Sequence, residues 1–376
     1  MVSKPLTDTI LEVRNLSVDY ASDTGTVHAV DDVSFDVKRG EIFGLAGESG
    51  SGKSTLAFAL ARLLKFPARI TGGQVLYHFR PDSELATHDD DCSGSIDILQ
   101  LEPEKLRQFR WRELAIVFQS AMNALNPVLD IQTQITDALR AHDDTMSRSR
   151  LHERAAELIR MVGISPDRLR SYPHQLSGGM RQRAIIAIAL ALNPELIIMD
   201  EPTTALDVVV QREILNEIKA LQAKLGFSVI FITHDLSLLL EISNHVAIMY
   251  AGRLVEMADQ EQLITHPYHP YTFGLIHSFP DLHGEKKKML GIPGHPPDLR
   301  SLPEGCPFAP RCAFAFEACT SVTPKLGSPE LAAGRQVSCH LYDPNQNPSG
   351  PPATVEPSSA LVTPRVNPTS PVGGIR

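Results

Sequence analysis

The string GESGSGKS at residues 47–54 constrains the fold most, because it matches the pattern G-x-x-x-x-G-K-[ST]. This pattern forms a turn between a buried strand and a helix, where glycines let backbone N–H groups close around phosphate oxygens. The flanks fit. Glu41–Ala46 is an apolar run of strand length, and Thr55–Lys65 contains helix formers with no breaker before Pro67. The sequence therefore predicts a nucleoside triphosphate site in an α/β fold.

The residue types in this loop fit the chemistry of phosphate binding. The following helix presents its positive N-terminus to the phosphates, Lys53 can reach the β- and γ-phosphates, and the Ser54 hydroxyl can ligate Mg²⁺. The residues expected to hold the nucleotide here are Gly47, Glu48, Ser49, Gly50, Ser51, Gly52, Lys53, Ser54 and Thr55.

Polar side chains end three further apolar runs. LIIMDEP (196–202) ends in Asp200 and Glu201, VFQ (117–119) ends in Gln119, and FSVIFITHD (227–235) delivers His234. Ligands of parallel sheets bind at the carboxyl ends of the strands, so we expect these groups beside the phosphate loop. Asp200 is the candidate Mg²⁺ holder, and Glu201 is the candidate base or orienter for an attacking water.

A second glycine turn, LSGGM at residues 176–180, also opens a helix and offers another anion-binding N-terminus. Two phosphate cradles so far apart in one chain could serve one nucleotide only if two copies of the domain faced each other.

Composition excludes several classes of protein. A formal charge of −9 argues against a nucleic-acid partner, and no apolar run is long enough to span a membrane. The N-terminus lacks the basic and apolar segments of a signal peptide. We therefore expect a soluble, cytosolic protein.

The chain resembles the ATP-binding cassette of ABC transporters in the order and spacing of its motifs. These motifs are Tyr20, GESGSGKS, Gln119, LSGGMRQR, LIIMDEP, ALD (205–207) and His234. The resemblance covers residues 8–265. It implies a P-loop NTPase cassette with a mixed sheet core, an antiparallel β edge and an α-helical subdomain at about 120–175, with ATP and Mg²⁺ as cofactors.

The resemblance also implies a role for each motif residue. Tyr20 would stack on adenine, Glu201 would polarise the lytic water, and His234 would contact the γ-phosphate. Gln119 would sense that phosphate and relay its presence to the membrane partner. The Mg²⁺ ligands would be Ser54, Gln119 and Asp200. The residues facing ATP on a second cassette would be Ser177, Gly178, Gly179 and Asp207.

Residues 266–342 contain HPYHPYTFGLIHSFPDL, LGIPGHPPDL and PEGCPFAPRC, which resemble the C-terminal extension of oligopeptide/dipeptide importer ATPases. The resemblance implies uptake of di- or oligopeptides powered by ATP hydrolysis at the cytoplasmic face of the inner membrane. The implied partners are a second ATPase subunit, two transmembrane permeases and an extracytoplasmic solute-binding protein. Import of nickel, glutathione or oligosaccharide stays open, as does a lyase-accessory ATPase that drives no transport. The solute and the identity of the partner cassette also stay open.

The extension carries Cys306, Cys312, Cys319 and Cys339, spaced C-x5-C-x6-C-x19-C. Four thiolates suit zinc or an iron–sulfur cluster, but the C-x2-C pairs typical of such sites are missing. Some members of the peptide branch bind a [4Fe–4S] cluster at such cysteines, so a cluster, zinc and no metal are all open. The distance in sequence from the ATP motifs favours a structural role over a redox one.

Two further segments carry no cassette motif. Residues 78–95 are polar and acidic, include Cys92, and read as an exposed flexible insertion of unknown role. Residues 343–376 are rich in Pro, Ser, Thr and Asn and predict a disordered tail.

Overall fold

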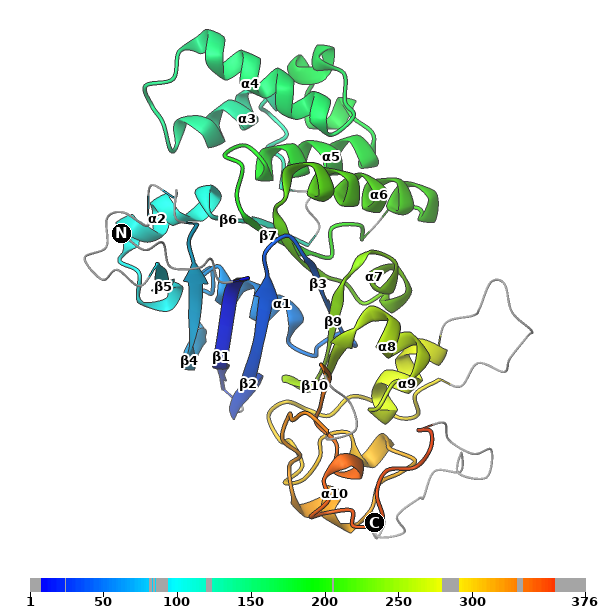
Figure 1. Ribbon diagram of the computed structural model, residues 1–376. Coiled ribbons are helices and arrows are strands. Elements are labelled where there is room, and N and C mark those ends of the chain that lie inside the picture. The colour runs from blue at the N-terminus through cyan, green and yellow to red at the C-terminus, as the bar shows by residue number, and fades with distance from the viewer. Residues whose placement is uncertain are drawn as a thin grey trace, which may run out of the picture.

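The computed structural model describes residues 8–23, 25–80, 83, 85, 94–119, 124–204, 206–278, 291–329 and 334–355 (Figure 1). Most of the predicted insertion at 78–95 lies outside the described residues, and so does the end of the predicted tail from 356 onward. The described part contains two sheets with helices packed around them.

A seven-stranded sheet with the order β11-β10-β9-β3-β8-β7-β6 forms the centre of the fold. Every residue is buried in β3 (Ile42–Ala46), β7 (Leu196–Asp200) and β8 (Ser228–Ile232). These strands run parallel to one another and to β6 (Leu114–Val117) and β9 (His245–Tyr250). Continuous apolar runs suit strands covered on both faces. The strand predictions at 41–46, 196–202 and 227–235 are confirmed, whereas the run VFQ supplies only Val117, the last residue of β6.

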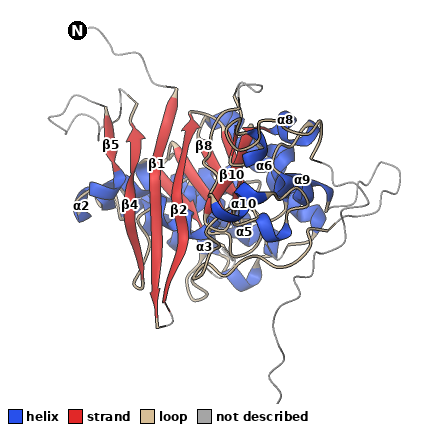
Figure 2. Cartoon of the chain, turned by 90° about the horizontal axis from the view of Figure 1, so that it is seen from below, coloured by secondary structure: helices blue, strands red, loops and turns tan. Residues whose placement is uncertain are grey.

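A second, antiparallel sheet has the order β2-β1-β4-β5 (Figure 2). Its strands are β1 (Thr9–Ser22), β2 (Gly25–Lys38), β4 (Ala68–His78) and β5 (Ser95–Asp97). It shares one hydrophobic cluster with β3 and α1 (Lys53–Leu60). This mixed core with an antiparallel edge is the predicted fold class.

Helices α3 (Ile131–Arg140), α4 (Arg148–Met161), α5 (Gly178–Ala189) and α6 (Val208–Leu225) gather at the top of Figure 1. Helix α3 contacts both α4 and α5, and α5 contacts α6 and β6, so this group is joined to the central sheet. The remaining helices of the cassette are α2 (Pro103–Arg112), α7 (Leu236–Ile242) and α8 (Gln260–Thr265).

Helix α1 is shorter than its sequence indicates. The run of helix formers reaches Lys65, but the helix ends at Leu60. Arg62 adopts a φ of 51°, and its guanidinium donates hydrogen bonds to the carbonyl oxygens of Ile98 and Leu101. Tertiary contacts therefore override local helix propensity here.

The C-terminal extension continues the central sheet. It contains α9 (Pro270–His277), α10 (Glu317–Ser321) and β11 (Gln336–Val337), which pairs antiparallel with β10 (Arg253–Asp259). Figure 1 shows this segment against the β10 end of the sheet.

Part of the predicted tail, residues 343–355, is described and folds back onto the extension. Val355 is 3% exposed and belongs to a small hydrophobic cluster with Phe273 and Leu341. The sequence signal for disorder was composition alone, which does not register a single apolar anchor of this kind.

Candidate nucleotide site

The phosphate loop (residues 47–54) connects β3 to α1 and has little space for side chains. Gly47 has a φ of 154° and Gly52 a φ of 101°. A Cβ atom on Gly47 would lie 2.1 Å from the carbonyl oxygen of Met249, and one on Gly52 would lie 2.1 Å from that of Ala29. Both positions therefore require glycine.

Lys53 lies inside this loop and is only 5% exposed. Its Nζ donates hydrogen bonds to the carbonyl oxygens of Gly47 at 2.8 Å and Glu48 at 2.9 Å. Burial lowers the pKa of Lys53, against the attraction of Glu201, Asp200 and Glu48. The Lys53 ammonium thus lies where the oxygens of a bound triphosphate would replace the two carbonyl oxygens as its hydrogen-bond partners.

Asp200 has the geometry of a metal-supporting carboxylate. It is 1% exposed at the end of β7, and Ser54 Oγ donates to its Oδ1 at 3.1 Å. Burial raises the pKa of Asp200. Its Oδ2 is buried without a hydrogen-bond partner among the described residues. An orphaned carboxylate oxygen beside a serine hydroxyl suits Mg²⁺, which is bound by hard oxygen ligands.

Glu201 lies at the centre of a polar cluster. Its φ of 47° places it in the left-handed region. Its Oε1 lies 3.1 Å from His234 Nδ1, and its Oε2 accepts hydrogen bonds from Gln119 Nε2 at 2.8 Å and Thr204 Oγ1 at 3.0 Å. Burial acts to raise the pKa of Glu201, but the bonds from His234 and Thr204, together with the charges of His234 and Lys53, outweigh it and lower the pKa. The cluster therefore holds an ionised, oriented carboxylate.

Three predicted residues thus meet at one point, namely Gln119, Glu201 and His234. Gln119 donates to Glu201, and its predicted role as a Mg²⁺ ligand with Ser54 and Asp200 stays a prediction. Thr204 was not predicted, although its position three residues after Glu201 in a turn was a usable signal.

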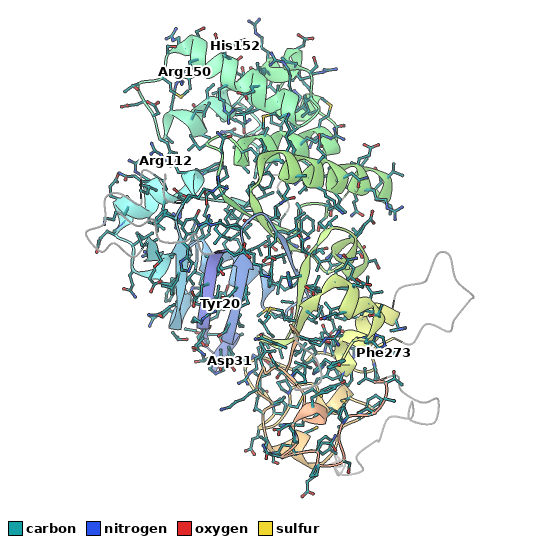
Figure 3. All side chains as sticks on the ribbon, in the orientation of Figure 1. Tyr20, Asp31, Arg112, Arg150, His152 and Phe273 are labelled. Atoms are coloured by element: carbon teal, nitrogen blue, oxygen red, sulfur yellow. The ribbon has the colours of Figure 1, made fainter. Side chains whose placement is uncertain are left out.

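Tyr20 on β1 reaches the start of α1. Its hydroxyl lies 3.2 Å from Thr55 Oγ1. Figure 3 shows the labelled Tyr20 on the antiparallel sheet. Tyr20 is therefore next to the start of α1, and its stacking on adenine stays a prediction.

The second glycine turn makes no hydrogen bond or ion pair with the phosphate loop in the described part of the chain. Exposed Ser177 instead caps α5 by accepting from Met180 N–H at 3.3 Å, and exposed Asp207 caps α6. Gly178 is the first residue of α5, and a Cβ on Gly179 would lie 2.8 Å from Val210 Cγ1. These four predicted residues form a separate face of the cassette.

The four cysteines of the extension are free thiols. The pKa of Cys312 is raised to about 12, chiefly by burial and to a smaller extent by the sulfurs of Cys306 and Cys319. Burial raises the pKa of Cys339 too, and the other three sulfurs add to this effect. All four therefore lie within electrostatic range of one another. Among the described residues, however, no group of three or more His, Cys, Asp or Glu side chains is arranged to hold a metal ion.

The sequence also did not predict two contacts to Glu48. Tyr271 Oη accepts a hydrogen bond from Glu48 N–H at 2.8 Å, and Arg311 pairs with the Glu48 carboxylate at 2.7 Å. The extension is therefore adjacent to the phosphate loop despite its distance in sequence.

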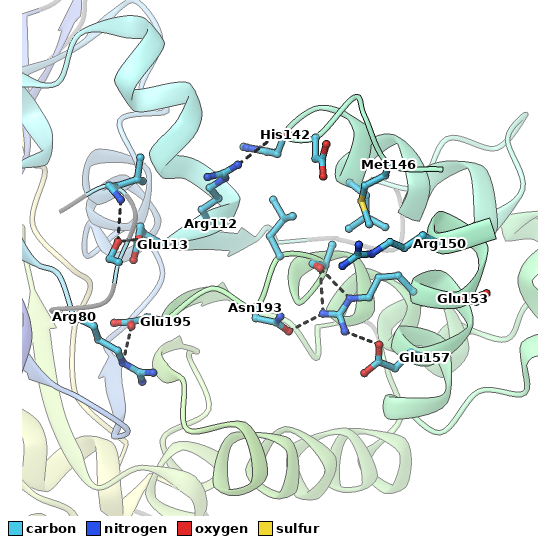
Figure 4. Close-up of a pocket in the computed structure, with 17 residues that line it drawn as sticks. Arg80, Arg112, Glu113, His142, Met146, Arg150, Glu153, Glu157, Asn193 and Glu195 are labelled. Carbon is cyan, nitrogen blue, oxygen red and sulfur yellow. Dashed lines mark hydrogen bonds and ion pairs between the residues drawn. The ribbon is translucent and has the colours of Figure 1, made fainter. Parts of the chain in front are cut away.

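A separate cavity of about 710 Å³ opens between α2 and α4 (Figure 4). Its wall includes Arg80, Arg112, His142, Arg150 and Glu195. No residue of the phosphate loop or of the Glu201 cluster lines it. It is therefore distinct from the nucleotide site.

Comparison with known proteins agrees with this geometry. Residues 30–204 match the ABC transporter family, and residues 255–319 match the oligopeptide/dipeptide transporter C-terminal region. The chain is 40% identical over 335 residues to the dipeptide transport ATP-binding protein DppD of Caldanaerobacter subterraneus subsp. tengcongensis, covering 89% of this chain and 97% of the relative. It is 41% identical over 343 residues to the probable peptide ABC transporter ATP-binding protein y4tR of Sinorhizobium fredii, covering 90% and 97%.

A solved structure gives the same result for the cassette. The dimeric post-hydrolysis state of the ATP-binding cassette MJ0796 bound to ADP and Pi has a TM-score of 0.56 and 27% identity, covering 67% of this chain and 99% of that chain. Fold and site together define an ATP-binding cassette. The chain belongs to the ABC transporter ATPases that carry an oligopeptide/dipeptide transporter C-terminal region. In the described part of the chain, no helix combines the length and the apolar character that crossing a membrane requires.

Proposed function

We propose that this chain hydrolyses ATP to power the uptake of dipeptides and oligopeptides through partner permeases. The observation that carries the proposal is the assembled Gln119–Glu201–His234 cluster in a chain whose extension is built into the cassette's own sheet. Relatives named for dipeptide and peptide transport support the cargo class. None of these relatives favours nickel, glutathione or oligosaccharide as cargo, or an accessory ATPase outside transport.

The residues of the chain divide the work of hydrolysis. Lys53 would leave its two carbonyl partners for the β- and γ-phosphates. Ser54 and Asp200 would hold Mg²⁺, which supplies charge neutralisation on the phosphates when bound. Glu201, fixed by Gln119 and Thr204, would orient the attacking water, and exposed His234 would contact the γ-phosphate.

Two cassettes would be needed to complete each site. The exposed face with Ser177, Gly178, Gly179 and Asp207 is separate from the phosphate loop, so it would cap ATP bound to a second ATPase subunit. Val208 and Val209 beside Asp207 are 70% and 68% exposed, and burying apolar surface would favour such pairing. The related cassette MJ0796 is dimeric in its solved structure.

The remaining partners follow from the importer assignment. The ATPase pair would bind two transmembrane permeases from the cytoplasmic face of the inner membrane, as a peripheral subunit. An extracytoplasmic solute-binding protein would deliver the peptide. The negative net charge supports the absence of a nucleic-acid partner.

Transport can be tested with the intact complex. The chain would be purified from its native membranes in mild detergent with the proteins that accompany it, and reconstituted into vesicles. We expect dipeptides or oligopeptides to stimulate ATP hydrolysis and to accumulate. Accumulation of nickel, glutathione or oligosaccharide without peptide uptake would contradict the cargo, and recovery of soluble partners alone would contradict transport.

We further propose that Cys306, Cys312, Cys319 and Cys339 hold a [4Fe–4S] cluster in preference to zinc. Backbone N–H groups point at the sulfurs. Phe314 N–H donates to Cys312 Sγ at 3.4 Å, and similar bonds lower the thiol pKa of Cys306 and Cys339 against the larger effect of burial. Hydrogen bonds of this kind tune iron–sulfur sites.

The cluster can be tested by anaerobic purification. We expect a brown protein with iron and acid-labile sulfide in equal amounts, and loss of both in Cys306→Ser. Cys92→Ser, which changes the cysteine outside this set, should keep the colour. A colourless preparation with zinc would contradict the cluster, and one without any metal would contradict metal binding altogether.

A further inference from the structure

Glu48, the second residue of the phosphate loop, forms an ion pair with a side chain from the C-terminal extension. Arg311 Nη1 donates to Glu48 Oε2 at 2.7 Å, and Arg311 Nη2 donates to Oε1 at 2.9 Å. The Arg311 side chain is 5% exposed and that of Glu48 is 26% exposed. A bidentate ion pair of this kind fixes the position of the Glu48 carboxylate and neutralises its charge.

Arg311 is itself held on several sides. Its Nε donates to the carbonyl oxygen of Pro293 at 2.7 Å, and its Nη1 donates to Tyr250 Oη at 3.3 Å. The guanidinium lies 5.8 Å from the ring centroid of Tyr250 and 5.9 Å from that of Phe308. Because Arg311 directly precedes Cys312, the cysteine-bearing turn determines where this cation stands.

A second contact from the extension reaches the backbone of the same loop residue. Tyr271, at 0% exposure on α9, accepts a hydrogen bond from Glu48 N–H at 2.8 Å. Both the carboxylate and the N–H group of Glu48 are therefore engaged by residues C-terminal to the cassette. The loop's position depends on the extension as well as on β3 and α1.

The charge of Glu48 makes this contact matter for nucleotide binding. An unpaired carboxylate in a loop that receives a triphosphate repels the ligand, and it competes with the phosphates for Lys53. The bidentate contact neutralises that carboxylate and turns it toward the extension. Without Arg311, the same loop would present an extra negative charge to ATP.

We propose that Arg311 is a positioning residue for the ATP site, so that the folded extension sets the affinity of the phosphate loop for nucleotide. The inference rests on the proposed role of residues 47–54 in binding ATP. It gives the extension a function at the ATP site that is separate from metal binding and from cargo.

Arg311→Gln in the full chain should weaken binding of a non-hydrolysable ATP analogue with Mg²⁺ by roughly tenfold, the order expected when one partner of a hydrogen-bonded charge pair is lost. Glu48→Gln alone should change the affinity little. The double variant Glu48→Gln/Arg311→Gln should recover most of it, because no carboxylate is then left unpaired. Titration calorimetry measures all three.

Matched variants separate positioning from general stability. Arg335 is also buried in the extension and donates to the carbonyl oxygen of Gln262 at 2.8 Å, away from the phosphate loop. Arg335→Gln should lower the melting temperature with unchanged nucleotide affinity. Arg311→Lys keeps the charge but cannot form the bidentate contact, so its affinity for the ATP analogue should lie between those of the wild type and Arg311→Gln. This variant replaces Arg311→Gln in the test if Arg311→Gln does not fold.

The outcomes are distinct. An unchanged affinity in Arg311→Gln or Arg311→Lys, or a loss that Glu48→Gln fails to reverse, would overturn the positioning role. If Lys53→Ala bound the analogue as tightly as the parent, the assignment of the phosphate loop itself would be wrong instead.

Discussion

Replacing Glu201 with glutamine should reduce ATP hydrolysis by about 10²–10⁴-fold, the usual contribution of a positioned acid or base. Glutamine has nearly the same shape and can keep contacts with Gln119 and Thr204, but it cannot accept a proton from water. The structure holds the Glu201 carboxylate ionised by hydrogen bonds from His234 and Thr204, so the change removes a charge that the site is built to keep. Binding of MgATP should survive.

Steady-state hydrolysis and nucleotide affinity, measured on the same preparation, test this separation. Slow hydrolysis should also trap a cassette dimer in the presence of ATP, which size-exclusion chromatography detects. Glu157→Gln is the control, because that exposed glutamate on α4 pairs only with Arg154 in the described structure. Hydrolysis by Glu201→Gln at the parent rate would remove Glu201 from the mechanism.

The cassette was predictable because its signals are local. Apolar runs of strand length became β3, β7 and β8, and each polar residue at a run's end reached the same edge of the sheet. Parallel strand order turns such sequence positions into neighbours in space. The Gln119–Glu201–His234 cluster follows from that rule alone.

The parts of the site that the sequence did not predict depend on long-range packing. Nothing near Arg311 in the sequence indicates a partner in the phosphate loop, because the two are joined only when the extension folds against β9 and β10. An acidic Glu48 in a triphosphate-binding loop is the available hint, since an unpaired carboxylate beside phosphates is repelled by them. Similarly, the left-handed backbone of Glu201 could not be read from its residue type.

Replacing Lys53 with alanine should weaken MgATP binding by about 100-fold or more, the order expected when one partner of a buried charge pair is removed. Lys53 is 5% exposed, and its ammonium is already directed into the loop by the carbonyl oxygens of Gly47 and Glu48. The bound triphosphate would lose its main cationic partner. Asp200 and Glu201, which attract the Lys53 ammonium, would also lose this counter-charge.

Two further variants, Lys53→Gln and Lys224→Ala, test whether the loss of MgATP binding in Lys53→Ala comes from the lost charge. Lys53→Gln keeps a hydrogen-bond donor for the carbonyl oxygens of Gly47 and Glu48, so it preserves more of the loop's internal structure than Lys53→Ala does. Both should lose MgATP in titration calorimetry, while Lys224→Ala at the exposed end of α6 should bind normally. If Lys53→Gln retained the parent affinity, the loop geometry would bind the phosphates without the lysine charge, and the cation would have only a structural role there.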